Sequence, residues 1–393
     1  MKTGRTKPLA CIISAGSSKY GKRDGLYARE LFAEAAYEAF DRCPNLDPQK
    51  DIDSVYVGQA YESLEHQANI SPGFAASIGL QKKPTVRVES VSSSSATALR
   101  HAIFGILGGM YDTIMIGGAE KMTHRSVGEA IEIISMAADF PFEQWQGATL
   151  PGLCALIARE HMRLYGTTEE QMAKVAVKNH RNAVDNPKAQ FRKEITIEEV
   201  MSSRIVADPL KLYDCSAITD GASCVIICKP EIARRYTDNF VEIIGTGEGS
   251  DAEIIMERES LTSFFSTKKA SEGAYSTAKV EPKDLDFAEV HDAFTINEII
   301  AYEDLGFCKK GEGGAMVDQG AFERDGKLPV NTSGGLKGKG HPVGASGAAQ
   351  VYEAYLQLTD QAGKRQIQSP QIGLTHAMGG AGVNVVSHIF RRH

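Results

Sequence analysis

Two twelve-residue segments that lie far apart in the chain align without a gap. They are KDIDSVYVGQAY, residues 50–61, and KDLDFAEVHDAF, residues 283–294. Each has a charged turn, then a strand-like run, then a small residue followed by an aromatic one. Because the same strand and the same ending recur, the chain is expected to contain two copies of one α/β unit.

Strand and helix patterns alternate on both sides of this repeat. The expected strands are Leu9–Ala15, Val86–Val91, a run from Thr113 to Met122 and one from Val241 to Gly247, and the expected helices are Tyr27–Cys43, about Ala96–Gly109, Ala155–Tyr165 and Glu169–Asn182. Residues from about 124 to 211 are richer in helical patterns and in charge. No low-complexity linker separates the halves, so they are expected to share one core.

The stretch from Asn331 to Gln350, NTSGGLKGKGHPVGASGAAQ, contains six glycines and runs directly into a helical pattern. Glycine at this density indicates backbone that turns tightly or approaches another group closely. His341 lies inside the stretch, where its charge can change near neutral pH, and it is therefore a candidate acid or base. The alternative is a glycine-rich turn that happens to carry a surface histidine.

Two further histidines stand in motif-like settings. His291 ends the second copy of the repeat, in HDAF, and His376 precedes Gly379 and Gly380 in LTHAMGGAG. Both are candidate catalytic groups, and the glycines would let the backbone come close to another group. The structural alternatives are a polar residue that ends a strand, for His291, and a loop histidine, for His376.

A nucleophile is favoured between a strand and a helix N-terminus, because backbone N–H groups and the helix dipole stabilise an anion there. The segment VRVES-VSSSSATALRHA has this form, with four consecutive serines from Ser92 to Ser95 after the strand. The residues alone leave the position of a nucleophile among these serines uncertain. Serine at this place is also a common N-cap, and capping does not exclude catalysis.

The glycine-rich stretch closely resembles the C-terminal signature of the thiolase superfamily, and HDAF matches the archaeal and sterol-carrier type of thiolase. The resemblance covers Ala10 to Phe390. It implies an α/β fold of two βαβαβαββ halves in five layers, α-β-α-β-α, with an inserted helical loop domain. The implied domains are residues 1–240, with the loop domain at about 120–210, and residues 241–393.

The resemblance also implies roles for the candidate residues. Members of the family carry a nucleophilic cysteine where this chain has Ser92. The serine could be an engineered replacement that traps substrate, the natural residue of a relative with altered chemistry, or the mark of a chain that binds acyl-CoA without turning it over. His341 would activate the nucleophile or bind the thioester oxygen, and His376 would exchange the α-carbon proton. His291 would serve an oxyanion hole, with Asp292 orienting it, and the backbone at Gly379, Gly380 and Gly382 would approach the acyl oxygen.

The implied function is acyl-CoA C-acyltransferase, which cleaves or forms the C–C bond of a β-ketoacyl-CoA by Claisen chemistry. The alternative is a catalytically silent acyl-CoA-binding subunit of a complex. Coenzyme A would be a substrate, with no permanently bound cofactor, and no phosphate-binding motif identifies its contacts. Relatives use acetoacetyl-CoA or bulkier substrates such as benzoylsuccinyl-CoA, and Trp145 is expected to line the acyl pocket. A homodimer or larger assembly and a small zinc-ribbon/OB-fold subunit are the implied partners.

Net charge, hydrophobicity and cysteine spacing exclude several other classes of protein. The net charge is −7, from 43 basic and 50 acidic residues, without a long basic run, so nucleic acid is not expected as a partner. No apolar run is long enough to cross a bilayer, and the basic, apolar start is interpreted as a first strand. Seven irregularly spaced cysteines predict no disulfide framework, and Cys224 and Cys228 are expected to be core thiols and not a metal site. A reducing, cytoplasmic location follows.

Overall fold

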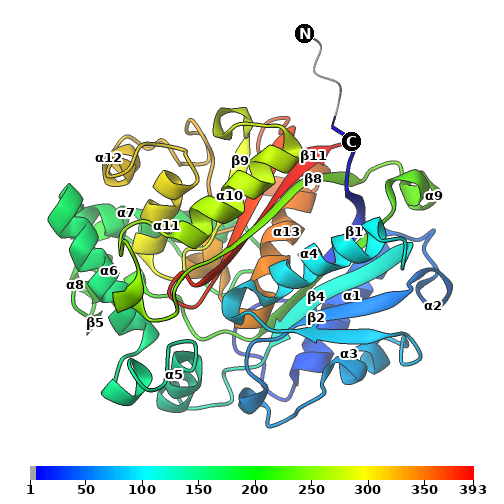
Figure 1. The fold of residues 1–393 in the computed structure, drawn as a ribbon, viewed down its shortest axis with the longest axis horizontal. Coiled ribbons are helices and arrows are strands. Elements are labelled where there is room, and N and C mark those ends of the chain that lie inside the picture. Colours follow the sequence, from blue (N-terminus) through cyan, green and yellow to red (C-terminus); the bar gives the residue numbers. More distant parts are fainter. Residues whose placement is uncertain (1–5) are drawn as a thin grey trace.

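The computed structural model describes residues 6–393, which form a mixed α/β fold around a nine-stranded sheet (Figure 1). The strands are β1 (Ala10–Ser17), β2 (Ser54–Gly58), β3 (Thr85–Val88), β4 (Thr113–Glu120), β7 (Gly221–Cys228), β8 (Val241–Ser250), β9 (Phe287–Val290), β10 (Ile372–Gly379) and β11 (Asn384–Arg392). Their order across the sheet is β3-β2-β4-β7-β1-β8-β11-β10-β9. The predicted α/β fold class is confirmed.

The strand order is duplicated about the short antiparallel pairing of β1 with β8 at the centre of the sheet. Outward from β1 the neighbours are β7, antiparallel, then β4, and then the parallel strand β2. Outward from β8 they are β11, antiparallel, then β10, and then the parallel strand β9. The two copies of the sequence repeat thus form β2 and β9, at matching places in the two halves.

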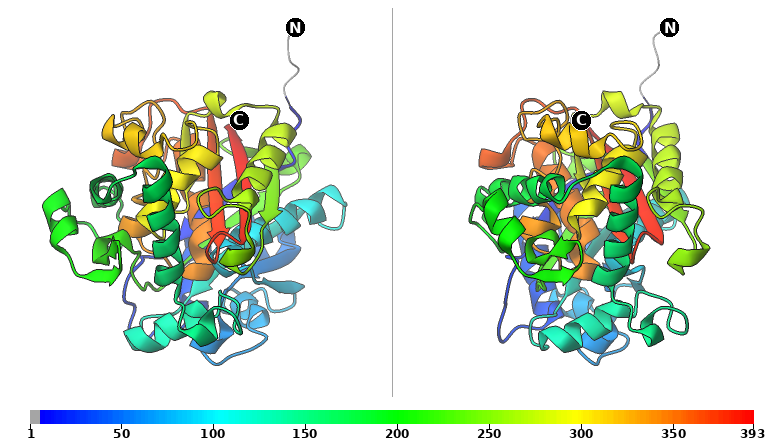
Figure 2. Two further views of the ribbon diagram at one scale, coloured as in Figure 1. Left: turned by 60° about the vertical axis from the view of Figure 1, so that its left-hand side comes forward. Right: turned by 90° about the vertical axis from the view of Figure 1, so that its left-hand side faces the viewer.

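Helices cover both halves of the sheet and fill the space between them (Figures 1 and 2). On one outer face, α1 (Ala28–Arg42) and α3 (Ser71–Ser77) pack in one apolar cluster. In the centre lie α4 (Ser94–Leu107) and α13 (Ser346–Leu358). On the other outer face lie α10 (Phe265–Ala278) and α11 (Thr295–Asp304). These three helical layers and the two halves of the sheet give the five layers expected from the sequence.

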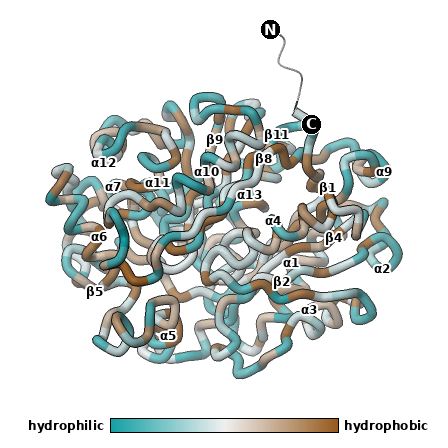
Figure 3. Tube along the Cα trace, viewed as in Figure 1, coloured by the Kyte–Doolittle hydropathy of each residue, from teal (hydrophilic) through white to brown (hydrophobic). Residues whose placement is uncertain are grey.

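The two central helices approach each other closely where the halves meet. A Cβ added to Gly347 in α13 would lie 2.6 Å from the backbone N of Ala96 in α4. Only a glycine at this position allows the two helix N-terminal ends to come so near. Figure 3 shows hydrophobic segments running through the strands, while α2 (Pro48–Asp51) is hydrophilic. Helix α12 (Gly313–Asp318) follows α11 in the chain.

Most expected elements appear with small shifts of their ends, but one strand is shorter than expected. The sequence predicts a strand to Val91, whereas β3 ends at Val88 because the chain turns out of the sheet toward α4. Cys224 and Cys228 lie buried in β7, and all seven cysteines are unpaired thiols.

The charged, helix-rich segment contains α5 (Val127–Ser135), α6 (Leu150–Tyr165), α7 (Glu169–Val184), α8 (Ile197–Ser202) and the short strands β5 (Ile205–Ala207) and β6 (Leu210–Lys211). Helices α6 to α8 gather at the left of Figure 1. The remaining helix, α9 (Ala233–Tyr236), follows β7. The domain boundary at residue 240 and the loop-domain limits of about 120–210 remain predictions. In residues 6–393 no helix has both the length and the apolar character needed to cross a membrane.

Candidate active site

The turn that carries Ser92 joins β3 to α4 through strained backbone. Val91 has a φ of 48°, which is unusual for a β-branched residue, and Ser92 follows it in a single 3₁₀ turn, Val91–Ser93. Helix α4 begins directly after this turn, so Ser92 lies at a helix N-terminus, as the sequence predicts.

Hydrogen bonds distinguish Ser92 from the serines around it. The hydroxyl of Ser93 donates to the Ser90 carbonyl, that of Ser94 donates to the Val91 carbonyl, and Ser95 Oγ accepts from the Ala348 N–H. The hydroxyl of Ser92 instead lies 3.2 Å from His341 Nε2. Of the four serines, Ser92 is therefore the one whose hydroxyl faces His341, and no side chain caps α4 at its N-cap, Ser93.

The His341 ring is oriented by a hydroxyl that the sequence analysis did not single out. Ser346 Oγ donates to the Pro342 carbonyl at 2.9 Å, so its lone pairs face His341 Nδ1 at 2.7 Å. Nδ1 must then carry the proton, and Nε2 accepts a hydrogen bond from the Ser92 hydroxyl. The backbone N–H of His341 donates to Thr219 Oγ1 at 3.1 Å. This is the orientation that a base needs in order to remove a hydroxyl proton.

Two buried carboxylates hold the loops that present His341. Glu120, at the end of β4, accepts from the N–H groups of Ala60 and Gly344, at 3.0 and 2.8 Å. Asp292 accepts from the N–H of Leu336 at 2.6 Å, and a Cβ on Gly335 would come within 2.3 Å of its Oδ2. Gly335 also has a φ of +59°, so glycine is required there both by backbone conformation and by space.

His291 and His376 lie next to each other behind this pair. The His291 ring packs edge-to-face on the His341 ring, with centroids 5.4 Å apart. The backbone N–H of His291 donates to His376 Nδ1 at 3.4 Å, and His376 Nε2 lies 3.1 Å from Thr267 Oγ1. The four residues predicted from the sequence, Ser92 and three histidines, are thus brought into one connected group.

Burial keeps all three histidines neutral. It lowers the pKa of His376 to about 3, and burial together with the positive charge of Lys339 lowers the pKa of His341 to about 3. The pKa of His291 is lowered well below its usual value by burial and by the two neighbouring rings. Burial raises the pKa of Glu120 and of Asp292 to about 7. Neutral imidazoles are the protonation state in which a ring nitrogen accepts a proton.

The backbone at the predicted glycines lies against one side of the group formed by Ser92 and the three histidines. A Cβ on Gly379 would lie 2.5 Å from the Ser90 carbonyl oxygen, so the end of β10 touches the Ser92 turn. Gly380 and Gly382 have φ values of +60° and +96°. Arg258 fixes one carbonyl of this loop, because its guanidinium donates to the Ala381 carbonyl at 2.6 Å.

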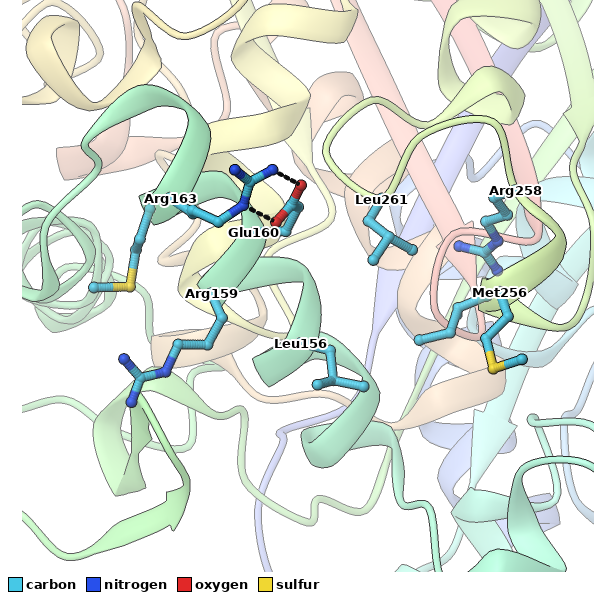
Figure 4. Close-up of a pocket in the computed structure, with 9 residues that line it drawn as sticks. Leu156, Arg159, Glu160, Arg163, Met256, Arg258 and Leu261 are labelled. Carbon is cyan, nitrogen blue, oxygen red and sulfur yellow. Dashed lines mark hydrogen bonds and ion pairs between the residues drawn. The ribbon is translucent and has the colours of Figure 1, made fainter.

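A cavity of about 780 Å³ lies beside that loop (Figure 4). One wall is α6, with Leu156, Arg159 and Arg163, and the facing wall is the segment that carries Met256 and Arg258. Arg159 pairs with Asp208 and Arg163 with Glu160. The cavity therefore combines apolar surface with cationic side chains whose charges are already partly balanced.

Trp145 does not line this cavity. Its ring is 73% exposed and lies 6.0 Å from that of Phe140. The segment nevertheless reaches the cavity wall, since Glu143 accepts from the Ile255 N–H at 2.8 Å. A role for Trp145 in the acyl pocket remains a prediction.

Sequence reasoning found the reactive candidates and missed the groups that orient them. Ser346 could have been noticed, because it follows His341 closely in the same glycine-rich stretch. Thr219 and Thr267 come from distant segments, and nothing in their local sequence marks them. No group of three or more metal-ligating side chains is arranged to hold a metal ion within the part of the chain that the structure describes.

Comparison with known proteins gives consistent matches along the chain. Residues 10–231 match the family described as "Thiolase, N-terminal domain", and residues 247–392 match "Thiolase C-terminal domain-like". The chain is 43% identical over 382 residues to acetyl-CoA acetyltransferase of Methanothermobacter thermautotrophicus, covering 97% of this chain and 99% of that protein. It is 36% identical over 396 residues to sterol carrier protein 2 of Oryctolagus cuniculus, covering 97% and 71%. A solved structure titled "Ltp2-ChsH2(DUF35) aldolase" shares the fold, with a TM-score of 0.84 at 24% identity over 99% of both chains.

Proposed function

The chain belongs to the thiolase family, of the type that includes archaeal acetyl-CoA acetyltransferase and sterol carrier protein 2, and we propose that it makes or breaks the bond between the α and β carbons of a β-ketoacyl-CoA. In this reaction Ser92 accepts the acyl group. The observation that carries the proposal is the 3.2 Å contact between Ser92 Oγ and His341 Nε2.

The acyl-transfer step follows from this geometry. His341 Nε2 takes the proton from the Ser92 hydroxyl as Oγ attacks the keto carbon, and the imidazolium is stabilised because Nδ1–H donates to Ser346. The helix dipole of α4 favours the negative charge at Oγ. The electron pair of the broken C–C bond moves onto the acyl-CoA fragment, whose α carbon then takes up a proton. The backbone at Gly379 and Gly380 would hold the acyl oxygen.

We place coenzyme A in the cavity between α6 and Met256. Arg258 supports this placement, since it lines the cavity and also donates to the Ala381 carbonyl beside the acyl site. In this arrangement Arg159 and Arg163 meet the phosphates. Replacing both by glutamine should raise KM for coenzyme A while leaving kcat within about threefold. A larger change in kcat than in KM would place coenzyme A elsewhere.

The serine at position 92 supports a second candidate, in which no acyl group is transferred to the protein. A hydroxyl is harder to ionise than a thiol, whose usual pKa is about 8.5. A retro-aldol cleavage of a β-hydroxyacyl-CoA needs only a base for the β-hydroxyl, which His341 could supply, and a proton for the α carbon. The structural neighbour titled an aldolase is consistent with this chemistry on the same fold. A silent acyl-CoA-binding subunit is the remaining alternative.

We also propose that two copies associate through β3. This strand ends the sheet, so one of its edges has no partner strand within residues 6–393. Apolar side chains lie exposed on β3, on α4, which packs beside it, and in the turn after α4: Val86, Phe104, Leu107 and Met110. Unpaired edges and exposed apolar surface favour strand pairing with a second copy.

A small zinc-ribbon/OB-fold subunit is a further proposed partner, supported by the structural neighbour whose title names a DUF35 chain. Co-expression with such a protein and measurement of the complex mass would test it, and separate elution of the two chains would count against it. We place the protein in the cytoplasm on the basis of its seven unpaired thiols.

The acyl-transfer proposal is tested by intact-mass measurement after incubation with acetoacetyl-CoA. An acetyl adduct on residue 92 that coenzyme A removes supports acyl transfer. Turnover of a β-hydroxyacyl-CoA, without coenzyme A and without any adduct, supports the aldol candidate. Tight coenzyme A binding with neither reaction supports the silent subunit.

A further inference from the structure

The buried histidines differ in what their ring nitrogens contact. His376 Nδ1 accepts from the backbone N–H of His291, so the proton of the neutral ring is on Nε2, which donates to Thr267 Oγ1. Both nitrogens are thus engaged with the protein. To exchange a proton with a substrate, the His376 ring would first have to break one of these bonds.

The His376 ring also faces away from the Ser92 turn. Alternate residues of a strand share a face, so His376 lies on the same face of β10 as Leu374, which packs with Ala274 of α10 in the outer apolar cluster. Thr267 lies in the first turn of α10. Among residues 6–393, no hydrogen bond or ring contact joins the His376 ring to Ser92 or to the His341 ring.

The His291 ring differs from the His376 ring both in its direction and in its hydrogen bonding. Its ring lies against His341, at 5.4 Å and nearly perpendicular, and its Nδ1 is a buried nitrogen without a partner. No hydrogen bond to either ring nitrogen is found in the described part of the chain. Among the three candidate histidines only His291 has such a nitrogen, and an unpaired buried polar atom costs about 1–3 kcal/mol of stability.

The reaction itself requires a proton carrier close to Ser92. In both candidate reactions the α carbon is bonded directly to the β carbon, which either is attacked by Ser92 or carries the hydroxyl that His341 deprotonates, and a C–C bond is only about 1.5 Å long. The group that exchanges the α-carbon proton must therefore lie beside this pair. His291 does, whereas His376 is connected to the pair only through the His291 backbone.

We propose that His291, and not His376, exchanges the proton at the α carbon, and that His376 is a positioning residue that fixes the end of β9 and hence the His291 ring. The inference rests on the proposed function and revises the role expected for His376 from the sequence. It holds for Claisen and aldol chemistry alike, because both pass through the same acyl-CoA enolate.

The rings of His291 and His341 together account for each proton that moves in the reaction. In the synthetic direction, neutral His291 takes a proton from the α carbon of acyl-CoA, and the resulting carbanion attacks the acyl carbonyl on Ser92. The tetrahedral intermediate then expels Ser92 Oγ as its bond to the acyl carbon breaks. The proton held by His291 returns to Oγ by way of His341, which lies between the two groups. Cleavage runs through the same transfers in reverse.

The test isolates the α-carbon step from acylation. A Ser92→Ala chain cannot be acylated at residue 92, and its incorporation of deuterium into acetyl-CoA in D₂O, read by mass spectrometry, reports only proton exchange at the α carbon. His291→Gln and His376→Gln are the matched variants, because glutamine offers a hydrogen-bond donor and an acceptor in place of the two ring nitrogens. Circular dichroism and thermal melting check that each variant folds.

We expect His291→Gln to slow exchange at least about 100-fold, the loss typical of a general base, and His376→Gln to stay within about tenfold of its parent. Added imidazole should restore exchange to His291→Ala and not to His376→Ala. Loss of exchange in His376→Gln, with rescue by imidazole in His376→Ala, would overturn the inference. It would also be overturned if the Ser92→Ala chain exchanged deuterium no faster than buffer alone. Exchange that depends on His291 without any adduct on Ser92 would sustain the inference and reject acyl transfer.

Discussion

Removing the Ser346 hydroxyl tests whether the orientation of His341 matters for turnover. Ser346 is 1% exposed and its Oγ lies 2.7 Å from His341 Nδ1, so Ser346→Ala leaves a buried N–H without an acceptor. An orphaned buried donor costs about 1–3 kcal/mol. If this cost falls on the transition state, in which the ring is charged, kcat should drop about 5- to 150-fold, at 1.36 kcal/mol per tenfold.

The assay is coenzyme A-dependent cleavage of acetoacetyl-CoA, followed by absorbance, in the chain with Ser92 and in the Ser92→Cys variant. Ser95→Ala is the matched control, because it removes a buried hydroxyl that accepts from the Ala348 N–H and does not touch His341. The control should lose stability and keep kcat within about threefold. A folded Ser346→Ala variant with undiminished kcat would refute the assigned tautomer.

Three other predictions concern stability and assembly. Burial lowers the pKa of His341 and His376 to about 3 and that of His180 and His388 to about 4, so only the unfolded chain binds their protons near pH 6. The free energy of urea unfolding should fall between pH 7 and pH 5 by up to ~1.4 kcal/mol per unit for each histidine, opposed by Glu120 and Asp292, whose pKa values are raised to about 7. A flat profile, or no smaller slope in His388→Gln, would contradict this. Gly347→Ala should destabilise by about 1–3 kcal/mol, whereas Gly128→Ala, with nothing within 4 Å, should be nearly neutral in the same urea series. Val86→Lys on the β3 edge should give a monomer in sedimentation, while Met256→Lys, equally polar and remote from β3, should sediment like the parent chain.

Much of the fold follows from local pattern. The pattern of Asp51–Val57 recurs in the second half and predicts the duplication. Two strands that lie in equivalent buried places of two halves need the same pattern of hydrophobic residues. The strand β3 ends three residues before the end that the sequence predicts. Propensity favours continuing the strand through Val91, but the tertiary structure turns that residue to a positive φ in order to present Ser92.

The candidate site residues can also be named from the sequence, whereas their orientation cannot. His291, His341 and His376 stand in ordered motifs that the sequence displays directly. Which nitrogen of each ring is free depends on Ser346, on Thr267 and on a backbone N–H, and only the packing of α10 and α13 against the sheet brings these groups together. The register of Ser92 among its neighbouring serines was open for the same reason.

The most direct measurement is the intact mass of the chain after brief exposure to acetoacetyl-CoA, with Ser92→Cys and Ser92→Ala measured beside it. The account predicts an acetyl adduct on residue 92 in the serine and cysteine forms, discharged by coenzyme A, and none in the alanine form. Folded serine and cysteine forms that bind acetoacetyl-CoA but remain unmodified, or an adduct that persists in Ser92→Ala, would contradict it.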